Sequence, residues 1–130
     1  MVVQLPRPEL ECYNKAMRSP FPTVAGELRR LLGAKLVAYI ANVGETRAVR
    51  QWAEGSRTPS ADGTESRLRL AYSVALCIAN TDGPATAQAW FQGLNPLLDD
   101  VSPARLLREG DLDTVGPKII SAERHFLANG

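Results

Sequence analysis

A cluster of side chains near the middle of the sequence has the chemistry that is needed to read DNA. On a helix, Arg47, Arg50 and Gln51 stand at positions i, i+3 and i+4 and project from one face. A guanidinium can bond guanine through two hydrogen bonds, and a glutamine amide can bond adenine in the same way. Thr46 and Arg57 flank this face and are placed to hold phosphates. The segment therefore predicts a DNA-reading face formed by these five residues.

Two short helices must position this face. Four apolar residues form a stripe along a helix that begins after Gly33: Leu36, Val37, Ile40 and Ala41. A second helix is predicted over residues 45–54, with Gly44 as the bend before it and Gly55 as its left-handed stop. Three residues of that helix are predicted to face the core: Val49, Trp52 and Ala53. Two helices that meet across a tight turn present the second one to a DNA major groove.

The second helix and its exit resemble the helix-turn-helix of Xre-type regulators. The residues that carry the resemblance are Val49, Trp52, Gly55, Arg57, Pro59 and Ser60. In those regulators a branched residue and a Trp of the recognition helix pack inward ahead of a G-x-R-x-P-S exit. The turn differs, because Asn42, Val43 and Gly44 stand where those regulators usually carry Gly-Val-Ser. The resemblance implies DNA binding, whereas the residues alone also fit a three-helix bundle that exposes a few arginines.

The charge of the chain is nearly balanced but unevenly distributed. The net charge is +1 over 130 residues, which argues against a strongly basic protein that coats nucleic acid. Eight basic and five acidic side chains lie in residues 23–69, whereas four basic and seven acidic ones lie in residues 70–130. The positive charge therefore accompanies the predicted DNA-reading face. The length suits one compact domain, or two small helical units that share a core.

Several classes of protein have little support in the sequence. There is no glycine-rich phosphate loop, no zinc-ligand set and no Cys/His or Ser/His/Asp arrangement, so we expect no enzymatic activity and no cofactor or metal. Four aspartates look like a carboxylate cluster but lack the spacing of a calcium loop, and we interpret them as caps and loop residues: Asp99, Asp100, Asp111 and Asp113.

The cysteines and the apolar runs indicate a cytoplasmic protein. Cys12 and Cys77 lie far apart in sequence, and a reduced cytosol suits them better than a disulfide framework, although two cysteines do not exclude one. No apolar run approaches the roughly twenty residues that span a bilayer, so we expect no membrane segment. Glu9 and Glu11, without an apolar core, argue against a signal peptide.

The predicted organisation is all-α. Residues 1–22 contain Pro6, Pro8, Pro20 and Pro22 and are interpreted as an extended or partly ordered arm, with at most a short helical turn over 13–17. Residues 23–80 form the helix-turn-helix domain, whose first helix begins at a cap on Thr23. Its last helix runs over 64–80 and is apolar on every side after residue 70. Such a helix is either the centre of the fold or part of a subunit interface.

Residues 81–130 are predicted to form a small helical domain, continuous with the first. Helices are expected over 85–92 and 103–109, the latter with Ser102 as its N-cap and Pro103 in its first turn. The last helix ends near residue 128 and begins at Asp113 or at Pro117. Its expected buried stripe is Val115, Ile119, Ala122 and Phe126.

This second part is similar to the toxin-binding domain of antitoxins of the MbcA and ParS type. The residues that carry the similarity are Trp90-Phe91, Leu94-Asn95-Pro96, Leu98, Ser102-Pro103, Leu106-Leu107, Glu109-Gly110 and Val115. In that family a Trp ends one helix, an Asn-Pro-x-Leu segment crosses over, and a Ser/Thr-Pro opens a short helix with a Leu-Leu pair. An Xre-like helix-turn-helix in front of such a domain is the full architecture of that family, so the similarity covers residues 23–130. The Gly116-Pro117 step departs from the pattern. It implies an antitoxin that blocks a RES-domain toxin, which consumes NAD, and that represses its own operon.

The resemblance also suggests which residues meet the toxin: Trp90, Phe91, Leu94, Leu98 and Leu106. At the C-terminal end, four polar residues are expected to pair with toxin groups that normally hold a charged dinucleotide: Glu123, Arg124, His125 and Asn129. Phe126 is either an apolar anchor for the partner or part of the core.

Two hypotheses about function follow from the sequence. The protein is either an antitoxin or a stand-alone helix-turn-helix regulator. We expect a homodimer or a toxin-antitoxin hetero-oligomer, because one recognition helix covers too few base pairs for strong specificity.

Overall fold

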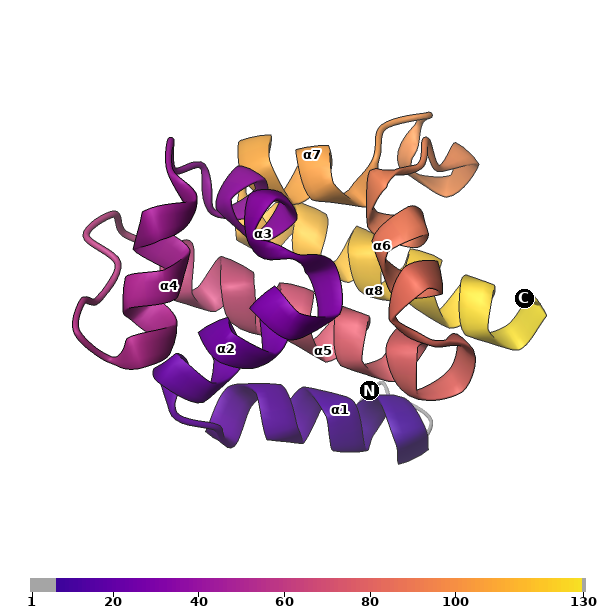
Figure 1. Ribbon diagram of the computed structural model, residues 1–130. Coiled ribbons are helices and arrows are strands. Elements are labelled where there is room, and N and C mark those ends of the chain that lie inside the picture. Colours follow the sequence, from indigo (N-terminus) through magenta and orange to yellow (C-terminus); the bar gives the residue numbers. More distant parts are fainter. Residues whose placement is uncertain (1–6, 130) are drawn as a thin grey trace.

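A computed structural model describes residues 7–129 of the chain, and this part is all-α, as the sequence predicted (Figure 1). Its helices are α1 Arg7–Arg18, α2 Phe21–Leu32, α3 Ala34–Ala41, α4 Thr46–Glu54, α5 Thr64–Asp82, α6 Pro84–Gln92, α7 Pro103–Glu109 and α8 Leu112–Asn129, with a 3-10 turn η1 at Pro96–Leu98. None of these helices is both long and apolar enough to cross a membrane.

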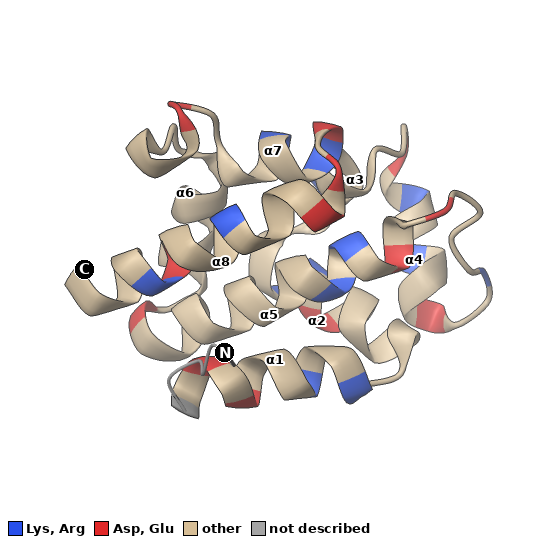
Figure 2. Ribbon diagram, turned by 180° about the vertical axis from the view of Figure 1, so that it is seen from behind, with Lys and Arg blue, Asp and Glu red and all other residues tan. Residues whose placement is uncertain are grey.

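Helix α5 lies at the centre of the fold. Nearly every residue from Leu68 to Ile78 is buried, including the polar Ser73. The helices α1, α2, α3, α6 and α8 all pack against it. In Figure 1, α1 runs below α5. Figure 2, seen from behind, shows α8 above α5. Of the two expectations for this apolar helix, the central position is confirmed. The predicted domain division at residue 80 falls inside its last turn.

The first helix corrects the expectation of an extended arm. Residues 7–18 form α1, whose inner face buries Glu9, Cys12 and Ala16 against α5. Arg69 of α5 holds the end of this helix, because its Nη1 donates to the carbonyl oxygens of Ala16 at 2.9 Å and Ser19 at 2.7 Å. Residues 1–6 of the expected arm lie outside the described residues.

Three of the prolines that suggested an arm, all among the described residues, stand at helix starts instead. Pro8 lies in the first turn of α1, and Pro22 lies in the first turn of α2, where the missing N–H has no intrahelical partner to lose. Pro20 is the N-cap of α2. The predicted cap at Thr23 is therefore wrong by three residues.

Helices α3 and α4 form the predicted pair across a tight turn. The left-handed residue of the turn is Asn42, with φ 59°, and its N–H bonds back to the end of α3, so the bend does not depend on Gly44. Glu45 is the N-cap of α4 and does not lie in its first turn. Gly55 ends α4 with φ 78°, as predicted. Val49 and Trp52 are buried, and the Trp52 ring lies 6.1 Å from the Phe21 ring of α2.

The segment between α6 and α8 is fixed by local caps. The Asn95 side chain accepts the Leu97 N–H at 2.9 Å, and the Ser102 hydroxyl accepts the Arg105 N–H at 3.1 Å, which makes Ser102 the predicted N-cap of α7. Asp99 and Asp100 take left-handed φ values in the loop. Among residues 7–129, no group of His, Cys, Asp and Glu side chains could hold a metal ion.

Helix α8 begins at Leu112 and contains Pro117. The start expected at Asp113 is thus right within one residue, and the start expected at Pro117 is wrong. Just before the helix, Asp111 accepts the N–H and the hydroxyl of Thr114, at 3.2 and 3.0 Å, and so compensates the free N–H groups of the first turn.

Candidate interaction surfaces

The predicted DNA-reading face lies exposed on α4. Thr46, Arg47 and Arg50 are exposed, and Gln51 is half-buried. Arg57 reaches back from the segment after α4 and donates to the Gln51 side-chain oxygen at 3.3 Å. The side chain predicted to hold a phosphate, Arg57, and one predicted to read a base, Gln51, are therefore bonded to each other in the absence of DNA.

A carboxylate also belongs to this surface. Glu54 lies one turn after Arg50, with 3.7 Å between the Arg50 Nε and the Glu54 Oε1. Both side chains are more than half exposed, so the ion pair is weak and screened by salt. Arg50 can therefore leave Glu54 at little cost when a stronger anion is near.

Half of the predicted toxin-binding residues converge on an apolar groove at the other end of the molecule. The groove has a volume of about 390 Å³ and lies between the end of α6, the segment through η1, and α8. It is lined by Ala89, Trp90, Gly93, Leu94, Asn95, Pro96, Leu97, Ala122, His125 and Phe126. In Figure 1, α4 lies at the left edge and the α6–η1 segment at the right, so this apolar groove and the DNA-reading face are far apart.

Aromatic contacts hold the floor of the apolar groove. The Trp90 ring meets the fully buried Phe91 ring edge-on at 5.3 Å, and it meets the half-buried Phe126 ring of α8 at 6.4 Å. Such pairs stabilise beyond the area that they bury. Trp90 thereby connects the core to the groove. Ring packing of this kind suits a docking surface, because packed side chains lose little freedom on binding.

Two leucines form the exposed rim of the apolar groove. Leu94 is 75% exposed and Leu97 is 54% exposed, which makes them the most exposed large apolar side chains in residues 7–129. Neighbouring exposed apolar side chains on a small protein usually mark a binding surface. The sequence pattern contained Leu94 but missed Leu97. The η1 turn, which Asn95 caps, turns Leu98 inward and leaves Leu97 outside. The Asn95-Pro96 pair was the signal in the sequence that could have predicted this turn.

The predicted toxin-binding residues divide into those that line the apolar groove and those that lie elsewhere. Trp90, Leu94, His125 and Phe126 line the apolar groove. Phe91 and Leu98 are buried in the core and offer no surface to a partner in this structure. Leu106 is half-buried on α7 and packs against the core, and Arg124 lines a different cavity. Of the two expectations for Phe126, neither is complete, because the ring packs on the core and also faces the groove.

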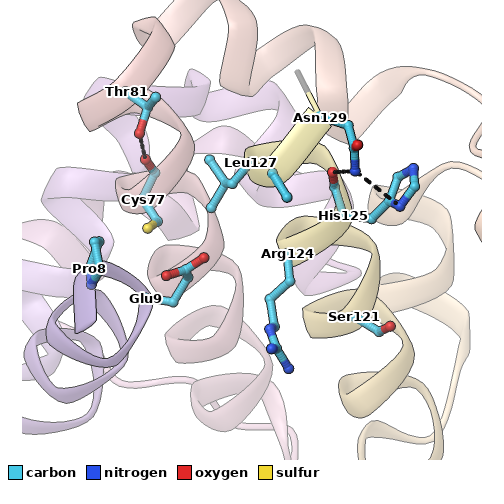
Figure 3. A pocket seen from close by; sticks show the side chains of 10 residues that line it. Pro8, Glu9, Cys77, Thr81, Ser121, Arg124, His125, Leu127 and Asn129 are labelled. Atoms are coloured by element: carbon cyan, nitrogen blue, oxygen red, sulfur yellow. Dashed lines mark hydrogen bonds between the residues drawn. The ribbon is translucent and has the colours of Figure 1, made fainter. Parts of the chain in front are cut away.

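That second cavity, of about 610 Å³, lies where α1 begins, α5 ends and α8 ends (Figure 3). Glu9 of α1 and Arg124 of α8 lie on its walls, together with Cys77 of α5. His125 borders both this cavity and the apolar groove, and its carbonyl accepts the Asn129 side-chain N–H at 2.9 Å. The last turns of α8 therefore separate two hollows.

Glu123 corrects the expectation that it meets a partner. It is 3% exposed, and its Oε2 has no hydrogen-bond partner among the described residues. Burial raises the pKa of this carboxyl to about 8, and the nearby Cys12 and Glu9 contribute in the same direction. A buried carboxyl without a partner is neutral over most of the physiological range.

Comparisons with known proteins give one clear likeness. No family model matches the chain, and no curated protein matches it. A chain in the crystal structure of the M. tuberculosis MbcT-MbcA toxin-antitoxin complex superposes with a TM-score of 0.62 and 24% sequence identity, over 82% of this chain and 96% of that one. The chain has the fold of that protein. The fold implied by the second resemblance is therefore confirmed.

Proposed function

We propose that the protein is the antitoxin of a type II toxin-antitoxin system, and that it acts in the cytoplasm by binding and blocking a RES-domain toxin that consumes NAD. The observation that carries this proposal is the apolar groove, where residues of the antitoxin-like pattern meet around exposed leucines. Further support comes from the fold, which is shared with a chain of a toxin-antitoxin complex.

The composition of the apolar groove suits a tight protein interface. Stable interfaces have an apolar centre with aromatic anchors and a polar rim. Here Trp90 and Phe126 form the centre, and Asn95 and His125 supply polar groups beside Leu94. Inhibition needs only that a stable surface covers or distorts the toxin, so the antitoxin works by binding and needs no catalysis of its own.

The test is co-expression with the neighbouring reading frame, followed by purification and an assay of NAD depletion. The complex should form and should leave NAD intact. Leu94→Asp and Leu97→Asp should each weaken inhibition at least about tenfold, because a buried unpaired carboxylate costs several kcal/mol at an interface. Leu10→Asp, at an exposed leucine of α1, is the matched control and should inhibit like the parent. Full inhibition by both groove variants would refute the assignment.

A second activity is favoured by the DNA-reading face. We propose that the antitoxin also represses its own operon, as a homodimer or within the toxin complex, by placing two α4 helices in successive major grooves. The exposed Arg47 and Arg50, and the Arg57–Gln51 hydrogen bond, support this. The alternative, a stand-alone regulator, would bind DNA without any toxin partner. The two surfaces lie at opposite ends, so one chain can use both at once (Figure 1).

A further inference from the structure

Two cysteines that are 65 positions apart in sequence lie side by side in the fold. Cys12 is on the inner face of α1, and Cys77 is on the facing side of α5. Both are buried, and neither is in a disulfide. They line the same cavity, each shifts the pKa of the other, and α1 packs along α5 around them. The fold therefore brings the two thiols together where α1 meets α5.

The sulfurs are buried, but small molecules can approach them. An open cavity of about 270 Å³ is lined by both cysteines, with Pro8, Lys15 and Thr81 on its other walls. Cys77 also lines the cavity of about 610 Å³, where Figure 3 shows its sulfur between Thr81 and Glu9. A water molecule occupies about 30 Å³ of liquid volume, and hydrogen peroxide is only slightly larger.

The surroundings make the two thiols unequal. The interaction between the two side chains lowers the pKa of Cys12 and raises the pKa of Cys77. Lys15 also favours the Cys12 thiolate, whereas burial, Glu9 and Glu11 oppose it. On the side of α8, Glu123 disfavours a Cys77 thiolate. Cys12 is therefore the thiol that reacts first, because the thiolate is the nucleophile.

We propose that Cys12 and Cys77 form an intramolecular disulfide when the protein meets a hydroperoxide, and that this bond fastens α1 to α5. The Cys12 thiolate attacks a peroxide oxygen, the O–O bond breaks, and the departing hydroxide takes up a proton, which gives a Cys12 sulfenic acid and water. The Cys77 sulfur then attacks the sulfenic sulfur. The S–S bond forms, the S–O bond breaks, and the hydroxide leaves as water with the Cys77 proton. Two thiols lose two electrons, and hydrogen peroxide becomes two waters.

The disulfide would close a loop of about 65 residues that contains the whole DNA-reading unit. Closing a loop of this length restricts the unfolded chain far more than the folded one. We therefore expect oxidation to raise the thermal midpoint by roughly 5 to 15 °C. This inference does not depend on the proposed function, since it concerns the chain alone.

The experiment treats the reduced full-length protein with hydrogen peroxide. Remaining thiols are blocked with N-ethylmaleimide in denaturant, and the protein is digested without reduction and measured by mass spectrometry. Trypsin cuts after Lys15 and after Arg69, so the two cysteines fall in different peptides. We expect one linked peptide pair in a monomeric chain, formed about tenfold faster than in urea, because the fold holds the thiols together.

Cys12→Ala and Cys77→Ala are the matched variants. Neither should gain stability on oxidation, and they control for oxidation of Met17, which is exposed. If a variant does not fold, the mass measurement on the parent chain still decides. Two intact thiols after treatment, sulfinic products without a linked peptide, or only cross-linked dimers would each overturn the proposal. The linked peptide with a raised thermal midpoint supports it.

Discussion

The buried Glu123 makes a strong prediction about pH. The substitution Glu123→Gln replaces a carboxyl by a neutral amide of nearly the same shape. In the folded chain the pKa of Glu123 is about 8, against an ordinary value of 4.5, and the main cause is burial. The neighbouring Cys12 and Glu9 raise it further. Loss of this proton therefore destabilises the folded parent chain, whereas the variant has no proton to lose at this position.

The sign of the effect follows from the raised pKa. Above pH 4.5 the unfolded chain releases the Glu123 proton, while the folded chain keeps it until pH is about 8. The free energy of unfolding therefore falls by about 1.4 kcal/mol for each pH unit across this window. The stability that depends on protonation of Glu123 is fully present below pH 4.5 and is lost as pH rises to about 8. At neutral pH the accumulated loss is about 3 kcal/mol.

The prediction is tested by unfolding the protein in urea at several pH values across this window, with tryptophan fluorescence as the readout. Glu123→Gln should match the parent at the acidic end and exceed its free energy of unfolding by about 3 kcal/mol at neutral pH. Glu109→Gln is the control, because Glu109 is exposed and only pairs with Arg105 at 3.2 Å. Groups such as His125 are common to all chains and cancel in the difference. Equal pH slopes for Glu123→Gln and the parent would refute the reasoning.

Three further predictions concern single side chains. Arg50→Ala should weaken operator binding in a gel shift by about 1 to 3 kcal/mol, if the guanidinium reads a base. Arg69→Met should lower the free energy of unfolding by about 2 kcal/mol in urea, because it removes charged donors from the Ala16 carbonyl at 2.9 Å and its neighbours. Gly110→Ala should lower the thermal midpoint, with a cost of about 1 to 3 kcal/mol, since a Cβ would meet Val115 Cγ1 at 2.5 Å.

Each of these has a matched control. Arg105→Ala removes an exposed arginine of α7, away from α4, and should bind DNA like the parent. Arg30→Met removes an exposed arginine that pairs only locally with Glu27, and should change stability by less than about 1 kcal/mol. Gly44→Ala adds a Cβ in open space and should be nearly neutral. A control that behaves like its partner variant would contradict the corresponding argument.

The sequence predicted best where local rules decide the structure. Gly55 ends α4, Ser102 caps α7, and the stripe of Val49 and Trp52 faces inward, all from signals within a few residues. The antitoxin-like pattern likewise contained Trp90, Leu94 and Asn95, which line one groove.

The failures come from contacts between distant segments. Helix α1 has no large apolar stripe, and its buried Cys12 and Ala16 find their partners only on α5. Glu123 follows the buried Ala122 on α8, and its carboxyl lies near Cys12 and Glu9 of α1. No sequence window contains both helices, so the burial of Glu123 could not be predicted. Leu97 and Leu98 are adjacent, and only the η1 turn decides which one is exposed.

The central position of α5 limits how such a protein can be recombined. Its residues are in the cores of both the helix-turn-helix part and the C-terminal part, because α2 and α3 pack on it as well as α6 and α8. A chimera that joins the first part to the last part of a relative must therefore keep one α5 that fits both, or rebuild its contacts. Related chains should therefore change their binding specificity by point substitutions at the surface. Recombination of two genes at a position inside or beside α5 should be rare.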